Sequence, residues 1–69
     1  MASIGEKRVR IEFNPSKIDT VDQIKQKSAE LINLVEELKS ADQEVNRLVA
    51  LAQTRYEEAA MYAVKAATG

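Results

Sequence analysis

The chain has 69 residues, so it forms one domain at most, and a core of that size gives only marginal stability. It contains neither cysteine nor histidine, which excludes disulfides and argues against an ordinary zinc or haem site, and we expect no cofactor. The net charge of -1 argues against binding of duplex nucleic acid, and no apolar run approaches the roughly 18 residues of a membrane span. No signal peptide is recognisable, so we expect a cytoplasmic location.

Residues 8–13 alternate charged with apolar side chains, a pattern that is typical of a half-exposed strand. The apolar positions are Val9, Ile11 and Phe13, and Arg8 and Arg10 lie between them. Nothing else in the chain resembles a strand. We therefore expect a short extended N-terminal arm over residues 1–13, whose first seven residues are mobile, and no sheet.

A first helix is predicted over residues 15–39. Pro15 suits a first helical turn, and Ser16 followed by Asp19 resembles a capping box. Apolar side chains with one polar member recur at heptad spacing along this helix: Val21, Ile24, Ser28, Leu31, Val35 and Leu38. Ile32 and Leu34 flank this seam, so the apolar surface is wider than one partner helix needs.

A second helix is predicted over residues 42–68, because Ser40 and Gln43 fit a second capping box. The junction contains no glycine or proline, so one continuous helix is the alternative. Seven of the ten alanines fall in the second helix, where small side chains allow several helices to approach closely. We predict an all-α fold in which residues 1–69 form an antiparallel helical hairpin that assembles into a homo-oligomeric bundle.

Basic residues gather at the open end of this hairpin, where the arm, the start of the first helix and the end of the second meet. They are Arg8, Arg10, Lys25, Lys27 and Lys65. Their local positive charge suits a compact phosphorylated anion better than a duplex, although lysines near a helix end most often form a solvated surface. Lys65 is harder to explain in this way, because it lies in an alanine-rich segment that we expect to be buried, with Thr68 on the same helix face.

Phe13 also has two interpretations, as an apolar cap on the open end of the bundle or as a stacking surface for a base. A histidine base, a cysteine nucleophile and a glycine-rich phosphate loop are all missing from the sequence, so we expect no enzyme.

Three segments together resemble a known family: GEKRVRIEFNPS, VDQIKQKSAELINLVEELK and LAQTRYEEAAMYAVKAATG. They are similar to the phage anti-CBASS cyclic-nucleotide sponges and to the helical-hairpin domain that these share with the first anti-Thoeris protein. The most specific part is the pattern T-x-x-E-x-A-A-M-[aromatic]-A-V-K-A-x-T, which runs from Thr54 to Thr68.

The resemblance implies a homohexamer that sequesters cyclic oligonucleotide immune signals intact, in the cytoplasm of the infected bacterial host. It implies that cyclic dinucleotides such as cyclic GMP-AMP lie between paired subunits, and that cyclic trinucleotides such as cyclic tri-adenylate lie on three-fold axes. By the same resemblance Phe13 stacks on a base, Lys25 or Lys27 holds phosphate, and Lys65 and Thr68 hold the larger ring.

Two departures from the family pattern bear on the ligand. Phe13 lacks the hydroxyl of a tyrosine, and the chain lacks the β-rich portion of the full anti-Thoeris protein, which argues against cyclic ADP-ribose-type signals. The arm is expected to bring Arg8 and Arg10 to the shared pocket beside Phe13. The alternative function is a structural homo-oligomeric hairpin that docks a protein partner.

Overall fold

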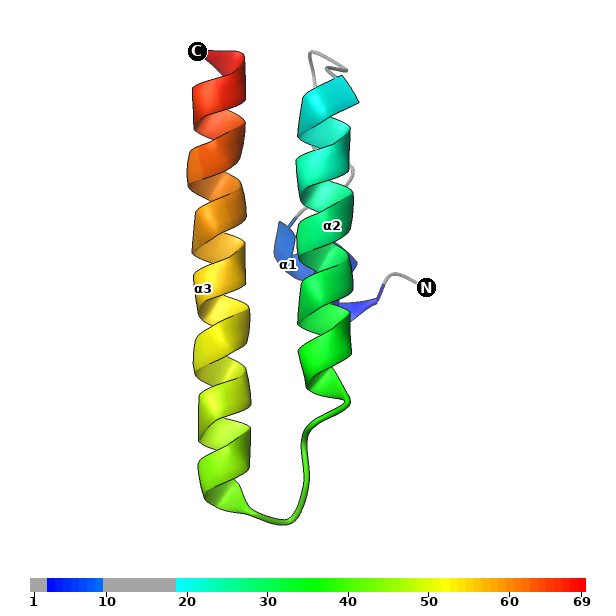
Figure 1. Ribbon diagram of the computed structural model, residues 1–69, viewed down its shortest axis with the longest axis vertical. Helices are drawn as coiled ribbons and strands as arrows, with labels where there is room; N and C mark the ends of the chain where they lie inside the picture. The colour runs from blue at the N-terminus through cyan, green and yellow to red at the C-terminus, as the bar shows by residue number, and fades with distance from the viewer. Residues whose placement is uncertain (1–2, 10–18) are drawn as a thin grey trace.

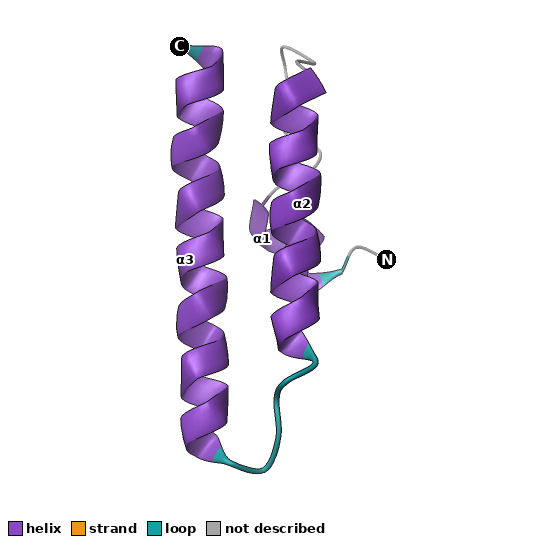
Figure 2. Ribbon diagram, in the orientation of Figure 1, coloured by secondary structure: helices purple, strands orange, loops and turns teal. Residues whose placement is uncertain are grey.

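A computed structural model describes residues 3–9 and 19–69 of the chain. It contains three helices in these segments: α1 (Ile4–Val9), α2 (Asp19–Glu36) and α3 (Gln43–Thr68). The long helices α2 and α3 run antiparallel, and α1 lies behind α2 in the view of Figure 1. The described segments contain helix and loop but no strand (Figure 2). The predicted all-α helical hairpin is therefore confirmed.

The N-terminal segment differs from its prediction. Residues 4–9 form α1, so the extended arm expected at residues 8 and 9 is wrong, and residues 4–7 are helical. Short-range alternation over a few residues does not exclude a helix when tertiary contacts favour one. Here the backbone N–H of Gly5 donates to Oδ1 of Asn33 on α2 at 2.9 Å, which satisfies one of the free N–H groups at the start of α1. Arg10, Phe13 and the predicted start of the first helix lie outside the described residues.

The α2–α3 interface is narrow and contains small side chains. Its centre is a buried cluster of Ala29, Ile32 and Ala60, with Ile24 and Tyr56 packed against it. This buried row is offset from the predicted heptad seam. A straight helix drifts relative to a strict heptad repeat, so a different row of α2 faces α3.

The offset has a clear effect on the leucines. Ile32, expected on the flank, is completely buried, whereas Leu31 and Leu38 of the predicted seam are exposed. Ile32 therefore contributes to the apolar area that is buried on folding, whereas Leu31 and Leu38 remain in contact with solvent.

The loop between the long helices also departs from the predicted boundaries. The helix α2 ends at Glu36 rather than at residue 39, and Asp42 rather than Ser40 caps α3. The carboxylate of Asp42 accepts from the N–H of Glu44 at 2.9 Å, and Oγ of Ser40 accepts from the N–H of Asp42 at 3.1 Å. Ser40 thus holds the backbone of Asp42, the residue that caps α3. The negative charge of Asp42 also interacts favourably with the positive end of the helix dipole.

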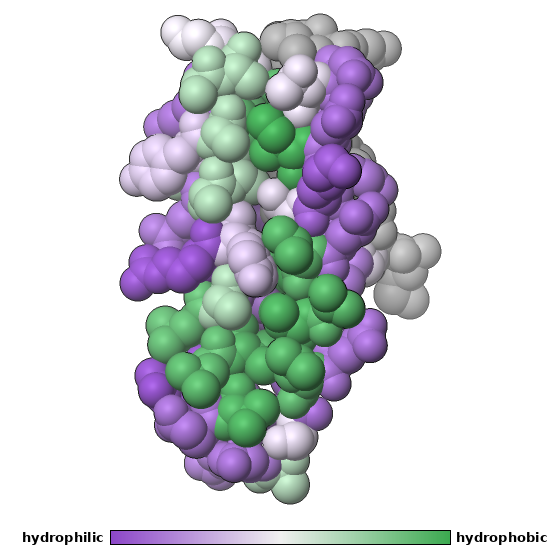
Figure 3. Space-filling model, viewed as in Figure 1, coloured by the Kyte–Doolittle hydropathy of each residue, from purple (hydrophilic) through white to green (hydrophobic). Residues whose placement is uncertain are grey.

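One face of the hairpin is apolar and uncovered. Figure 3 shows apolar surface over the turn-proximal halves of α2 and α3, on the side away from α1. Large exposed apolar side chains occur in this part of the chain: Leu31, Leu34, Leu38, Leu48 and Leu51. A patch of contiguous apolar surface is unusual for a monomeric protein and is typical of an interaction surface.

Gly5 is a residue at which α1 lies close against the backbone of α2. A Cβ at this position would collide with the carbonyl oxygen of Ala29 and would lie 2.8 Å from Oδ1 of Asn33. We predict that Gly5→Ala displaces α1 and lowers the melting temperature. The steric conflict should cost about 1–3 kcal/mol, which exceeds the roughly 1 kcal/mol gained in helix propensity.

Hydrogen exchange at the α1 amides, followed beside thermal melting, measures this effect. Faster exchange in α1 with a lower melting temperature is the expected result. Unchanged exchange together with a higher melting temperature would mean that propensity dominates and that α1 is not closely packed.

Candidate functional site

Lys25 is a buried basic residue in the part of the chain that the structure describes. Its side chain is only 4% exposed, whereas Lys27 lies exposed on the same helix. Lys25 precedes Ala29 by four residues and Asn33 by eight, so all three occupy one row of α2. Ala29 and Asn33 are the residues that Gly5 of α1 approaches. A charged side chain at such a depth has compensating polar or anionic groups around it, and the role of Lys25 in holding phosphate stays a prediction.

Lys65, the second candidate lysine, lies at about the same level along the hairpin as Lys25 but on another surface. Because Ala29 packs with Ala60, continuing the antiparallel register by one turn places Lys25 opposite Val64, the neighbour of Lys65. Lys65 is exposed in the last turn of α3, so the expectation that it would be buried is wrong within the single chain. Lys25 and Lys65 therefore do not share one pocket in a single chain.

The end of α3 presents an accessible polar and apolar row. Thr68 is exposed, and its hydroxyl donates to the carbonyl of Val64 at 2.9 Å, which leaves the oxygen able to accept from a ligand. Met61 and Tyr62 are exposed about two turns before Thr68.

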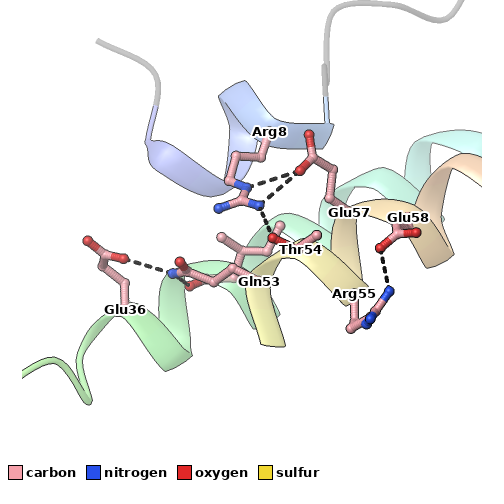
Figure 4. A network of polar contacts seen from close by, with 8 residues as sticks. Arg8, Glu36, Gln53, Thr54, Arg55, Glu57 and Glu58 are labelled. Atoms are coloured by element: carbon pink, nitrogen blue, oxygen red, sulfur yellow. Dashed lines mark hydrogen bonds and ion pairs between the residues drawn. The ribbon is translucent and has the colours of Figure 1, made fainter. Parts of the chain in front are cut away.

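Arg8 has partners that the sequence did not reveal. Figure 4 shows its guanidinium reaching from α1 to α3, where Nη2 donates to Glu57 Oε2 at 2.9 Å and to Thr54 Oγ1 at 3.1 Å. Nε donates to the same carboxylate oxygen at 3.2 Å. These contacts join residues about fifty positions apart, so no local pattern predicts them. Arg8 thus links two helices, while Arg10 and Phe13, expected beside it, lie outside the described residues.

Two general features of the described residues concern other kinds of site. No helix in residues 3–9 or 19–69 is both long and apolar enough to cross a bilayer. In the same segments, no three or more acidic, histidine or cysteine side chains converge as metal ligands do.

The model of the Acb2/Tad1 hairpin domain matches residues 5–68, which include nearly all of α1 and the whole of α2 and α3. The chain belongs to this family. The resemblance seen in the sequence is thereby confirmed, and membership points to an anti-defence sponge function. Comparisons with curated proteins and with solved structures give no match.

The hairpin domain contains a buried polar contact that sequence reasoning missed. Gln53 is 2% exposed, and its Nε2 donates to the carbonyl of Ile32 at 3.1 Å and to Oε1 of Glu36 at 2.7 Å. A glutamine inside the apolar face of the second helix was the available signal. The amide joins α2 to α3 below the buried cluster and so fixes the register that places Lys25 and Lys65.

The hydrogen bond from Gln53 lowers the pKa of Glu36, and a hydrogen bond from Lys39 lowers it further. A carboxylate with a lowered folded-state pKa contributes stability that is present above its unfolded pKa and is lost as the pH falls through the folded value. We predict that the melting temperature of the hairpin domain falls between about pH 5 and pH 3 more steeply than that of Glu36→Gln.

The variant is informative because its neutral amide oxygen can still accept from Gln53 but does not titrate. Melting curves across this pH range provide the measurement. Equal slopes for the two proteins would show that the Gln53–Glu36 contact does not contribute to acid sensitivity.

Proposed function

We propose that this chain is a non-enzymatic sponge that binds cyclic dinucleotides and cyclic trinucleotides of bacterial anti-phage immunity and sequesters them intact. The family match over residues 5–68 carries the proposal. The basic side chains of Lys25, Lys27 and Lys65 on the two long helices suit a compact phosphate-bearing ligand. The place of action in this proposal is the cytoplasm of the infected host.

The sponge would act as a homo-oligomer, with a homohexamer as the expected assembly. The uncovered apolar face near the turn supports self-association, because Leu34, Leu38 and Leu48 otherwise remain in water. The alanine-rich α3 supports it as well, since small exposed side chains permit close approach of a neighbouring helix. Symmetric copies would add further groups to the surface around Lys65.

The proposed cyclic-dinucleotide site contains Phe13, Lys25 and Arg10. Phe13 would stack on a base, and Lys25 is favoured over Lys27 for phosphate because a charge shielded from water interacts more strongly with an anion. The proposed cyclic-trinucleotide site contains Lys65 and Thr68, whose exposure at the end of α3 leaves them accessible to a ligand on a symmetry axis.

Separate sites predict separate losses of affinity. Phe13→Ala should weaken cyclic GMP-AMP and spare cyclic tri-adenylate, and Lys65→Ala should do the reverse. Loss of one stacking contact is worth about 1–3 kcal/mol, or roughly a five- to 150-fold loss of affinity. Calorimetric titration of both ligands, with sedimentation of each variant, measures the pattern.

The pair Lys25→Ala and Lys27→Ala serves as the matched comparison on α2. Only Lys25→Ala should weaken cyclic GMP-AMP, since Lys25 is the lysine that the proposal assigns to phosphate and Lys27 lies outside its row on α2. Binding of neither ligand by the unchanged protein, or no change in any variant with an intact oligomer, contradicts the proposed sites.

A second function has one observation in its favour. The uncovered apolar face would equally accept a protein partner, so a structural hairpin module that docks another protein is the alternative. An intact oligomer that is indifferent to both cyclic nucleotides in the titration would favour that alternative.

A further inference from the structure

The helix α1 is fastened to α2 at its N-terminal end. Asn33 makes two contacts there: its Oδ1 accepts from the N–H of Gly5 at 2.9 Å, and its Nδ2 donates to Oγ of Ser3 at 3.1 Å. Gly5 is buried and has no room for a side chain against Ala29. These contacts fix the height of α1 along the row of α2 that carries Lys25.

The other end of α1 is fastened to α3 by Arg8 alone among the contacts described. The guanidinium and the Glu57 carboxylate are 2.9 Å apart, and their side chains are 25% and 42% exposed. Two guanidinium nitrogens are occupied by Glu57, and one of them also reaches the hydroxyl of Thr54. Because α1 contacts α2 as well, Arg8 makes α1 a bridge across the hairpin.

This geometry disfavours a direct role for Arg8 in holding phosphate. The carboxylate of Glu57 would repel an anion, and a phosphate would be left with Nη1 alone unless it displaced Glu57 and Thr54 from Nε and Nη2. Gly5 of α1 lies against Ala29 and Asn33, and Lys25 precedes Ala29 by one turn in the same row of α2. Arg8 can therefore act on this row through α1, without any contact between Arg8 and the ligand.

We propose that Arg8 is a positioning residue for the cyclic-dinucleotide site: by joining α1 to Glu57 and Thr54 it holds α1 against the row of α2 that carries Lys25. This inference rests on the proposed function. It adds to that proposal that the ion pair of Arg8 with Glu57 holds α1 in place, so that the basic and the acidic residue serve the same role.

Glu57→Arg separates the two roles of Arg8, because it adds positive charge and also breaks the bridge. If Arg8 positions α1, this variant weakens cyclic GMP-AMP about three- to tenfold, as expected for loss of a partly exposed ion pair with charge-assisted hydrogen bonds. If Arg8 holds phosphate, releasing it from Glu57 tightens binding instead. Glu57→Gln, which is the same size as glutamate, should give a smaller loss of the same sign.

The charge reversal Arg8→Glu with Glu57→Arg is the decisive variant. Arg8→Glu alone should weaken cyclic GMP-AMP and accelerate hydrogen exchange in α1, and the double variant should restore both. Sedimentation and circular dichroism of the full chain confirm that mass and helix content are unchanged. Affinity that stays low in the double variant while α1 exchange recovers would overturn the positioning role.

Arg55 and Glu58 provide a matched control on α3. They form an ion pair of 3.0 Å within the helix, without α1 (Figure 4). Arg55→Glu changes the charge of the protein as much as Arg8→Glu does, but it breaks no contact with α1, so it should leave the affinity for cyclic GMP-AMP unchanged. An equal loss of affinity in Arg55→Glu would mean that the change of charge alone explains the effect. Failure of the unchanged protein to bind would overturn the proposed function itself, whereas binding without rescue overturns only the role of Arg8.

Discussion

The close contact of α2 with α3 around Ala29, Ile32 and Ala60 is the constraint on which the rest of the structure depends. Two of these three residues are alanines, and one long polar side chain, Gln53, is buried at the same interface. Its amide is buried but fully used as a donor, to Ile32 and Glu36. The register set in this way determines the height of every candidate ligand residue on the two helices.

The same constraint gives the hairpin two different faces. One face is crossed by α1, which is joined to α2 through Asn33 and to α3 through Arg8, and it contains the row with the buried Lys25. The other face is apolar toward the turn and has no cover in the described part of the chain (Figure 3). Under the proposed function, one face would serve a charged ligand and the other self-association, and assembly would then add the buried area that a core of this size lacks.

The sequence predicted those features that depend on local pattern, and failed on those that depend on distant contacts. Capping residues and apolar periodicity were sufficient for a two-helix hairpin, and the motif ending at Thr68 was sufficient for the family. The helix at Ile4–Val9 was missed because Asn33 and Glu57, far along the chain, stabilise it. The roles of Phe13 and Lys65 remain predictions, because each depends on a ligand and on neighbouring copies.

Native mass spectrometry of the unchanged protein, mixed with cyclic GMP-AMP and cyclic tri-adenylate, tests the central claim most directly. The account predicts a homo-oligomer, with six copies expected, that retains both ligands at their unaltered masses, since a sponge binds without cleaving. Dissociated complexes should return the cyclic nucleotides intact. A monomer without ligand, or an oligomer that releases linear or hydrolysed nucleotides, would contradict the account.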